Sequence, residues 1–535
     1  MGVRAPALAV ASLATPRMSF APRRIAVVLD GPPTPRWQAR ALAALERSAA
    51  LAVAEVRLAG ARRRGLTRRA HAAIERHLFA LGPDALAPAS LERARPGADA
   101  SRGPAELVVW LSEHPLPADE RREVLYLRHG RVAEPAEDAF RRAALRRRPC
   151  VETEVLLRRG RDTLLVARTI SAARPFSTTL SRDKALWKIA ALVCRAAERA
   201  PGLALTAAAS EQPDAAPSTF ELLAQSPWAW LHVVSARLLF RRLWQIRVRE
   251  RESQPTKGWT RARPLVRWKP GHLYADPFLF EQDGRHHLFC EELAPGATRA
   301  VISHTELPLD GSVADPPAPV LEAAYHLSYP FVFEHEGQVY LIPETSSQGR
   351  VELYRATDFP STWTRERILL DGLAACDATL LRDGGRLWLF VGVAVPDATM
   401  LDELHLFTAT TLEGPWQPHP RNPIVSDVRC ARPAGAIQRW GSRLVRPGQD
   451  GSRRYGGAVS FREIDVLSLE DYAEHEIARL EPGDLGTAAR ATHTYAADDR
   501  FEAVDLRERE LSIGPALMLL RRGLRRALGP LGRRR

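Results

Sequence analysis

The second half of the chain repeats a pattern of apolar and polar residues that is typical of β-hairpins. In HLYADPFLFEQDGRHHLFCEE, residues 272–292, two largely apolar runs flank an Asp-Gly turn. The same plan returns in residues 327–345 and 376–392, more weakly in residues 432–448, and most faintly in residues 492–506. The pattern therefore predicts one hairpin in each of five successive segments.

These hairpins recur with a period of about fifty residues, which indicates a β-propeller. Gly284, Gly337, Gly385 and Gly441 align the turns of the four clearest copies, and Asp499 lies in the fifth turn. One four-stranded blade cannot bury both of its faces alone, so repeated blades must pack side by side. We therefore predict a five-bladed propeller, and with it an all-β domain.

The repeat places four residues in one register near the start of each hairpin, namely Asp276, Tyr329, Asp377 and Pro433. The first strand of a propeller blade lines the central channel, so we expect these residues to ring one mouth of the channel. A simpler interpretation is that Asp276-Pro277 only begins an edge strand, because proline cannot donate a hydrogen bond to a sheet.

The amino-terminal part of the chain alternates strand and helix patterns. Residues 23–31 predict a strand, a helix and a second strand follow, and residues 106–116 predict another buried strand. This order predicts a parallel, Rossmann-like α/β layer. Residues 151–171 predict a hairpin, and an amphipathic helix is expected to begin at a Ser181 cap. No glycine-rich nucleotide motif follows a strand, so no nucleotide site is predicted.

Two arginine-rich segments, residues 226–250 and 515–535, have Trp or Leu faces like those of interfacial helices. We expect the first to be a linker helix on the propeller, and adsorption of the second to anionic lipid stays open. No apolar run of about 18 residues predicts a membrane span. The expected organisation is a disordered leader (1–21), an α/β domain (22–210), a linker helix (211–254), the propeller (255–508) and a basic amphipathic tail (509–535).

The composition indicates which partners and which cellular compartment to expect. The net charge is +13, but the arginines are scattered among alanine-rich runs and form no known nucleic-acid reader, so no nucleic-acid partner is expected. The five cysteines contain no Cys-x-x-Cys pair and predict free thiols in a reducing compartment. We expect a cytoplasmic protein, located at the inner face of the membrane if its tail binds lipid. No metal-ligand cluster and no cofactor motif are found in the sequence.

The propeller motifs resemble known carbohydrate-active families. Asp276-Pro277, Asp377 and LEGPW at 412–416 resemble the five-bladed propellers of glycoside hydrolase family 43, invertases and levansucrases. HLSYPFVFEHEGQVYLIPE (326–344) and HPRNPIVSDVRCARPAG (419–435) are more similar to the amino-terminal propeller of plant glucosamine inositolphosphorylceramide transferases.

The amino-terminal part resembles a formyltransferase domain, and bacterial proteins with such a domain before a propeller share this plan. His114-Pro115 follows a strand in the region where formyltransferases carry an Asn-x-His pair, but the Asn is missing. We therefore expect a degenerate, scaffold-like domain that binds neither a folate formyl donor nor NAD.

The resemblance to the hydrolases implies roles for three acids. It makes Asp276 the base or nucleophile and Asp377 the orienting acid, and leaves Glu344 as the nearest candidate for the proton donor. Glu344 and its equivalent Glu291 end the second strand of their hairpins, which we expect to lie away from the channel mouth. Glycosyl chemistry needs two carboxyl groups across the scissile bond, one of them kept protonated. Alternatively, these acids accept backbone hydrogen bonds and hold the blades together.

Other polar residues of the hairpins are candidates for substrate binding. Arg432 and His493 suit a phosphate or carboxylate, although each also fits as a hydrogen-bonding link between blades. The candidate substrate-binding residues are Tyr329, Glu291, Arg432, Asp450, Tyr455 and His493.

We expect the protein to act on a sugar or glycoconjugate, by glycosyl transfer or hydrolysis, in cell-surface polysaccharide or glycolipid synthesis. One alternative is a propeller that binds carbohydrate without turnover. The other is acyl or formyl transfer to an amino sugar by the amino-terminal domain.

Overall fold

The computed structural model describes residues 21–511, except residues 61–64, 80, 92–103, 131–134, 201–205, 209–226, 228–229, 232–239, 253 and 262–263. The expected leader (apart from residue 21), the first part of the expected linker helix and the basic tail beyond residue 511 thus lie largely or wholly outside the described residues. The chain divides into two compact units, an amino-terminal one and a carboxy-terminal one. Within the described residues no helix is long and apolar enough to cross a membrane.

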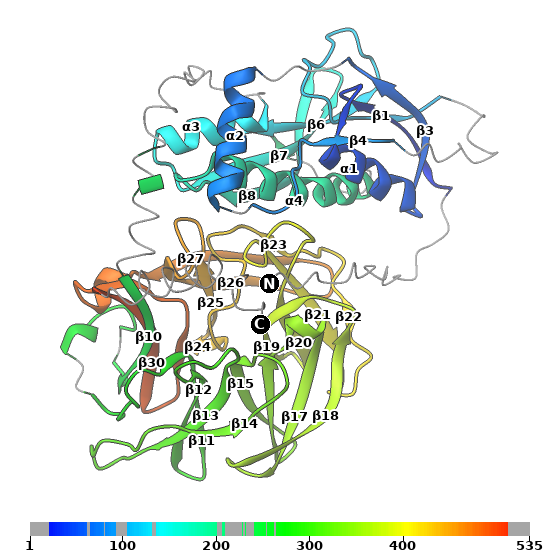
Figure 1. The fold of residues 1–535 in the computed structure, drawn as a ribbon. Coiled ribbons are helices and arrows are strands. Elements are labelled where there is room, and N and C mark those ends of the chain that lie inside the picture. Colours follow the sequence, from blue (N-terminus) through cyan, green and yellow to red (C-terminus); the bar gives the residue numbers. More distant parts are fainter. Residues whose placement is uncertain are drawn as a thin grey trace, which may run out of the picture. The chain divides into compact units, whose positions relative to one another are not determined.

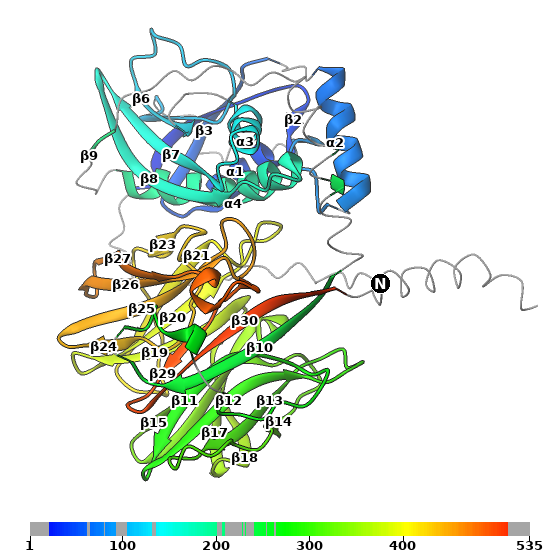
Figure 2. The same ribbon diagram turned by 90° about the vertical axis from the view of Figure 1, so that its left-hand side faces the viewer.

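The amino-terminal unit is an α/β fold on a seven-stranded mixed sheet (Figures 1 and 2). The order across the sheet is β3 (Leu51–Leu58), β1 (Arg23–Leu29), β5 (Leu107–Trp110), β6 (Glu123–His129), β7 (Cys150–Arg159), β8 (Asp162–Ala172) and β9 (Thr206–Ala207). The helices are α1 (Arg36–Arg47), α2 (Leu66–Phe79), α3 (Ala136–Leu145) and α4 (Thr178–Arg199), and β2 (Thr34–Pro35) pairs with β4 (Pro88–Ala89).

The predicted α/β layer is present, but the sheet is not wholly parallel. The first four strands of the order are parallel, whereas β6, β7, β8 and β9 pair antiparallel. For β7 and β8 the reason is local, because they form the hairpin predicted for residues 151–171, and the strands of a hairpin can only pair antiparallel.

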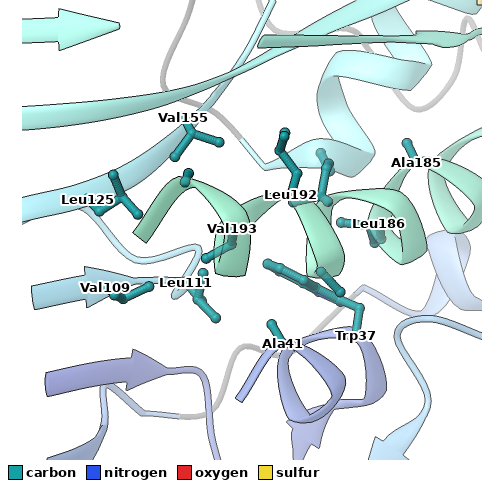
Figure 3. Close-up of a cluster of buried hydrophobic side chains, with 14 of the residues drawn as sticks. Trp37, Ala41, Val109, Leu111, Leu125, Val155, Ala185, Leu186, Leu192 and Val193 are labelled. Carbon is teal, nitrogen blue, oxygen red and sulfur yellow. The ribbon is translucent and has the colours of Figure 1, made fainter. Parts of the chain in front are cut away.

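Helices α1 and α4 pack against one face of this sheet and form its main core (Figure 3). Trp37 of α1 and Leu186 of α4 are among the fully buried side chains there. The cap of α4 is Ser177, not Ser181 as predicted, and its hydroxyl accepts a 3.1 Å hydrogen bond from the backbone of Leu180. Glu75 accepts two further backbone N–H groups at this end, so α4 begins one residue after Ser177.

The carboxy-terminal unit is the predicted five-bladed propeller. Its five sheets surround a common axis (Figure 1), and the first strands of successive blades contact one another from blade 1 to blade 3. Blade 1 consists of β11 (Leu273–Gln282), β12 (Arg285–Leu293), β13 (Val301–Leu307) and β14 (Ala318–Leu321). Blade 2 consists of β15 (Ser328–His335), β16 (Gln338–Glu344), β17 (Arg350–Asp358) and β18 (Thr362–Asp371).

The remaining blades are less regular. Blade 3 consists of β19 (Ala375–Asp383), β20 (Arg386–Val393), β21 (Glu403–Ala409), β22 (Gln417–Pro418) and β23 (Val425–Ser426). Blade 4 consists of β24 (Gln438–Trp440), β25 (Arg443–Asp450), β26 (Ala458–Leu467) and β27 (Tyr472–Leu480). Blade 5 consists of β28 (Ala489–Ala491), β29 (Tyr495–Ala497), β30 (Phe501–Leu511) and β10 (Phe240–Glu250).

Strand β10 closes the propeller by pairing antiparallel with β30 along its whole length (Figure 2). The linker helix expected over 211–254 is therefore wrong for residues 240–250. Trp244, Ile246 and Val248 are buried at every second position, which is the period of a strand and not of a helix. The propeller consequently extends from β10 to the end of β30, beyond the predicted bounds of 255 and 508 at both ends.

Candidate functional site

Three of the four residues predicted to share a register lie at β-bulges with unusual backbone geometry. Asp276, Tyr329 and Asp377 have φ values of 50°, 46° and 53°. At each of them the first strand carries one extra residue relative to its partner strand. Bulges re-aim side chains, and a positive φ is rare for residues other than glycine and clusters at functional sites. The repeated geometry marks this end of the channel as the candidate site.

Asp276 of blade 1 is buried and contacts both neighbouring blades. Its carboxylate accepts a 2.6 Å hydrogen bond from the hydroxyl of Thr494 in blade 5. It also accepts the backbone N–H of Tyr329 in blade 2 at 3.3 Å. Burial raises the pKa of Asp276 to about 6, with His493 opposing the shift and Glu291 adding to it. This carboxyl group can therefore change its protonation near neutral pH.

Asp505 and Thr494 are site residues that sequence reasoning missed. Asp505 on β30 is fully buried, and one of its carboxylate oxygens lies 2.5 Å from Nδ1 of His493, whose hydrogen-bond partner is the hydroxyl of Thr494 at 3.1 Å. The same imidazole nitrogen lies 3.5 Å from a carboxylate oxygen of Asp276. Burial opposes protonation of His493, but the charges of Asp505 and Asp276 outweigh it and raise the pKa of the imidazole. Thr494 and Asp505 carry no motif, and only the pairing of blade 5 with blade 1 brings them to Asp276.

Asp377 of blade 3 forms a buried ion pair with Arg432. The guanidinium donates from Nε to one carboxylate oxygen and from Nη2 to the other, the second at 3.1 Å. Gln449 of blade 4 donates a further hydrogen bond of 3.2 Å to Asp377. Arg432 was predicted to hold a phosphate or carboxylate of a ligand, but its charge is already neutralised by Asp377. Its contacts match the alternative prediction of a link between blades.

Glu291 and Glu344 lie beside the bulges, although we expected both to be away from the channel mouth. Glu291 pairs with Ala275 and Glu344 pairs with Ser328, each one residue before a positive-φ position. Antiparallel pairing brings the end of the second strand back to the start of the first, which explains the difference. Burial raises the pKa of Glu344, and repulsion by Asp377 adds to the shift.

Tyr329, predicted to contact substrate, is buried with no exposed surface. Its hydroxyl lies 2.8 Å from the hydroxyl of Thr379 in blade 3. The same hydroxyl accepts a 2.8 Å hydrogen bond from the backbone of Gly435, at the start of blade 4. Tyr329 therefore connects three blades and leaves no surface for a ligand.

Tyr455 is the partly accessible aromatic residue of the candidate site. The residue is 37% exposed, and its ring meets that of His493 edge to face at a centroid distance of 4.8 Å. The Arg432 guanidinium lies 5.5 Å from the Tyr455 ring centroid. Asp450, another predicted binding residue, instead accepts a 2.6 Å hydrogen bond from Arg479 and caps the backbone of Ser452.

The site is acidic and rich in hydrogen-bond acceptors. Arg432 and His493 are its main cationic groups, and both are paired with carboxylates. Gln449 is buried, and within the described part of the chain its Oε1 atom has no hydrogen-bond partner. The acidic side chains of the site are Asp276, Glu291, Glu344, Asp377 and Asp505.

The sequence suggested no metal cluster, but one group in the site has suitable spacing. The ligand atoms of Asp276, His493 and Asp505 lie within 4.8 Å of one another. Nδ1 of His493 already lies 2.5 Å from a carboxylate oxygen of Asp505 and 3.1 Å from the hydroxyl of Thr494, so a metal ion at this nitrogen would have to displace these contacts. The observed hydrogen bonds therefore account for the arrangement as a chain of polar contacts.

Comparison with known proteins bears out the resemblance of the propeller. Residues 258–497 match the family described as glucosamine inositolphosphorylceramide transferase 1, N-terminal. The chain is similar to glucosamine inositolphosphorylceramide transferase 1 of Arabidopsis thaliana, with 33% identity over 211 residues, which is 39% of this chain and 28% of the relative. The relative from Oryza sativa subsp. japonica is 34% identical over 218 residues, 40% of this chain and 29% of the relative.

The chain thus aligns with less than a third of the length of these relatives. The family match does not extend to the amino-terminal unit, so the likeness of that unit to formyltransferases stays a prediction.

Solved structures similar to this chain include two glycoside hydrolases. One is Zg3597, a family 117 enzyme of Zobellia galactanivorans, with a TM-score of 0.33, 10% identity, and coverage of 51% of this chain and 91% of that chain. The other is the GH43_1 enzyme from Xanthomonas citri, with a TM-score of 0.34, 13% identity, and coverage of 47% of this chain and 89% of that chain.

Proposed function

We propose that this protein is carbohydrate-active and that the acidic mouth of its propeller carries out glycosyl transfer or hydrolysis. The observation that carries this proposal is the presence of two acidic side chains, Asp276 and Glu344, at the bulges of neighbouring blades. Both carboxyl groups are buried, they come from neighbouring blades, and both have raised pKa values. Glycosyl chemistry uses two carboxyl groups in different protonation states, one to activate the attacking hydroxyl and one to protonate the leaving oxygen.

In this proposal Asp276 is the base and Glu344 is the acid. Asp276 takes a proton from water or from an acceptor hydroxyl, while Glu344 gives its proton to the oxygen of the breaking glycosidic bond. Proton exchange with solvent then restores both groups. Asp377, held by Arg432 and Gln449, repels a negative charge on Glu344 and so favours its protonated form. Asp377 would therefore orient and tune the site without taking a proton itself.

The names of the relatives support a sugar or glycoconjugate as the substrate class. They are called glucosamine inositolphosphorylceramide transferases, and their match to this chain lies in the propeller that carries the site. Because the chain aligns with under a third of their length, we do not assign their complete activity to this protein. A role in cell-surface polysaccharide or glycolipid synthesis is part of the same proposal.

The charge of the site suggests what kind of sugar it would hold. Its carboxylates outnumber its cations, and the guanidinium of Arg432 is engaged by Asp377. Such a surface favours hydroxyl and amine donors and repels phosphate or carboxylate groups. We therefore replace the phosphate expected near Arg432 with an uncharged or amino-bearing sugar.

A second candidate is a propeller that binds carbohydrate without turnover. The partly exposed residue Tyr455 favours it, because an aromatic residue beside acidic hydrogen-bond acceptors suits a sugar whether or not a reaction follows. The two functions separate on a panel of nucleotide sugars and oligosaccharides, with product formation followed by mass spectrometry and binding by calorimetry. Product formed by the wild type but not by Glu344→Gln supports the enzyme, whereas equal binding by both proteins without any product supports the binding module.

The setting of the protein also remains a proposal. We place it in the cytoplasm, because all five cysteines are free thiols in the structure. The basic tail would add contact with anionic lipid at the inner face of the membrane. The amino-terminal unit would be a Rossmann-like, formyltransferase-derived scaffold without activity of its own. Co-sedimentation of the full chain and of a chain ending at residue 511 with anionic vesicles tests the membrane contact.

A further inference from the structure

The Asp505 carboxylate accepts three backbone hydrogen bonds and forms one ion pair, all with residues at or beside Asp276. One carboxylate oxygen accepts the backbone N–H of His493 at 2.8 Å and that of Thr494 at 3.1 Å. The other forms an ion pair with Nδ1 of His493 at 2.5 Å and accepts the backbone N–H of Asp276 at 3.3 Å. The carboxylate is fully buried, so it contributes to the site through these partners and not by contact with a ligand.

The partners of Asp505 are the groups that hold the Asp276 side chain. Thr494 donates its hydroxyl to Asp276 at 2.6 Å, and the imidazole of His493 lies 3.5 Å from the same carboxylate oxygen. The His493 ring is fixed from its other sides, by Trp244 at a centroid distance of 4.1 Å and by Tyr455. A change at Asp505 would therefore affect Asp276 through the side chains of His493 and Thr494. It would also affect Asp276 through the backbone N–H of Asp276, which Asp505 accepts.

We propose that Asp505 is the positioning residue of the site, which orients His493 and Thr494 and through them holds Asp276 in the geometry from which it acts. The inference rests on the proposed function only for the role of Asp276. The contacts of Asp505 stand whether or not a sugar is turned over.

The positioning has an electrostatic consequence for His493. The groups that face its ring are Asp505, Asp276, Arg432 and Tyr455, and Asp377 is close enough to interact with its charge. Asp505 and Asp276 raise the pKa of the imidazole, while burial and Arg432 lower it. Removing the charge of Asp505 takes away the nearest stabilising group, so the imidazole should lose its proton at a lower pH.

The same hairpin provides a matched control residue. Asp498, between β29 and β30, accepts a 2.8 Å hydrogen bond from Nδ1 of His286. It also accepts the backbone N–H groups of Arg500 and Phe501, as Asp505 accepts those of His493 and Thr494. Asp498 thus has the same kind of contacts, but it contacts His286 and makes none with His493 or Asp276.

The experiment is an NMR pH titration of the histidine rings in the full chain, with the His493 signal assigned from His493→Gln. In the wild type we expect His493 to titrate above its ordinary value of about 6.5. Asp505→Asn should lower this midpoint by about one pH unit or more, a tenfold loss of proton affinity. Asp498→Asn should leave the midpoint of His493 unchanged.

An unchanged His493 midpoint in folded Asp505→Asn overturns the proposal. If that variant does not fold, the titration of the wild type tests the proposal alone. A wild-type His493 midpoint at or below about 6.5 also overturns the proposal. Asp505→Glu, which retains the charge, should keep the midpoint higher than Asp505→Asn does. No substrate is needed, so a protein with the expected titration but no turnover contradicts the proposed function and leaves the positioning role intact.

Discussion

Arg432 donates two hydrogen bonds to the carboxylate of Asp377, and this buried pair joins the start of blade 4 to the first strand of blade 3. Burial opposes the charge on the guanidinium, but Asp377 outweighs it and raises the pKa of Arg432 well above its ordinary range. The guanidinium therefore keeps its charge, whereas burial raises the pKa of Asp377 in spite of the opposing effect of Arg432. Each charge is stabilised by the other, because both side chains are buried and water cannot replace the missing partner.

Replacing Arg432 should consequently destabilise the propeller strongly. Arg432→Leu leaves Asp377 buried without its counter-charge, a change that typically costs about 3 to 5 kcal/mol. Chemical denaturation followed by tryptophan fluorescence measures the free energy of unfolding. Arg285→Leu, which removes an exposed ion pair with Glu306, is the control and should leave the unfolding midpoint unchanged. Similar small effects in both variants would show that Arg432 is free to serve a ligand.

Because β10 closes the propeller, substitutions on its two faces should differ in their effect on stability. Ile246 is buried against the propeller core, whereas the adjacent Gln245 is exposed. Ile246→Asp places a charge in that core and should lower the thermal midpoint by several degrees or abolish folding, while Gln245→Asp should be almost neutral. Equal tolerance of both substitutions contradicts the pairing of β10 with β30.

Tyr329→Phe separates the observed role of Tyr329 from the predicted one. Removing the hydroxyl leaves the backbone N–H of Gly435 buried without its acceptor, which costs on the order of 1 to 3 kcal/mol. Affinity for any sugar that binds the wild type should not change, because Tyr329 is buried. A loss of sugar affinity without a loss of stability, measured by calorimetry and thermal unfolding, would restore Tyr329 as a contact residue.

The sequence predicted the parts of this structure that repeat. The spacing of the hairpins was enough to identify the blades and to bring Asp276, Tyr329 and Asp377 into one register. Strand β10 was missed because its partner β30 lies more than two hundred residues away, and pairing over such a distance leaves no local signal. Asp505 was missed for the same reason, since it is one acidic residue in an ordinary strand until tertiary pairing places it beside Asp276.

The ionisation of Asp276 should set the acidic side of the curve of turnover against pH. The base must be ionised, and burial raises its pKa to about 6, so kcat/KM should rise with pH from 5 to 7. The folded-state pKa is raised, so the stability due to this group is present at low pH and is lost as pH increases through about 6. Activity should thus increase over the range in which stability falls. A rate that is flat between pH 5 and 7 contradicts Asp276 as the base.

The central claim is that Asp276 acts as a base and is not merely a link between blades. Asp276→Asn keeps the shape of the side chain and removes its proton-accepting charge. We expect turnover of an accepted sugar substrate to fall by about 10² to 10⁴-fold, with a thermal midpoint equal to that of the wild type or higher. Turnover and thermal midpoint are therefore measured side by side for the two proteins. A variant with a clearly lower midpoint and unchanged specific activity contradicts the claim and makes Asp276 a structural residue.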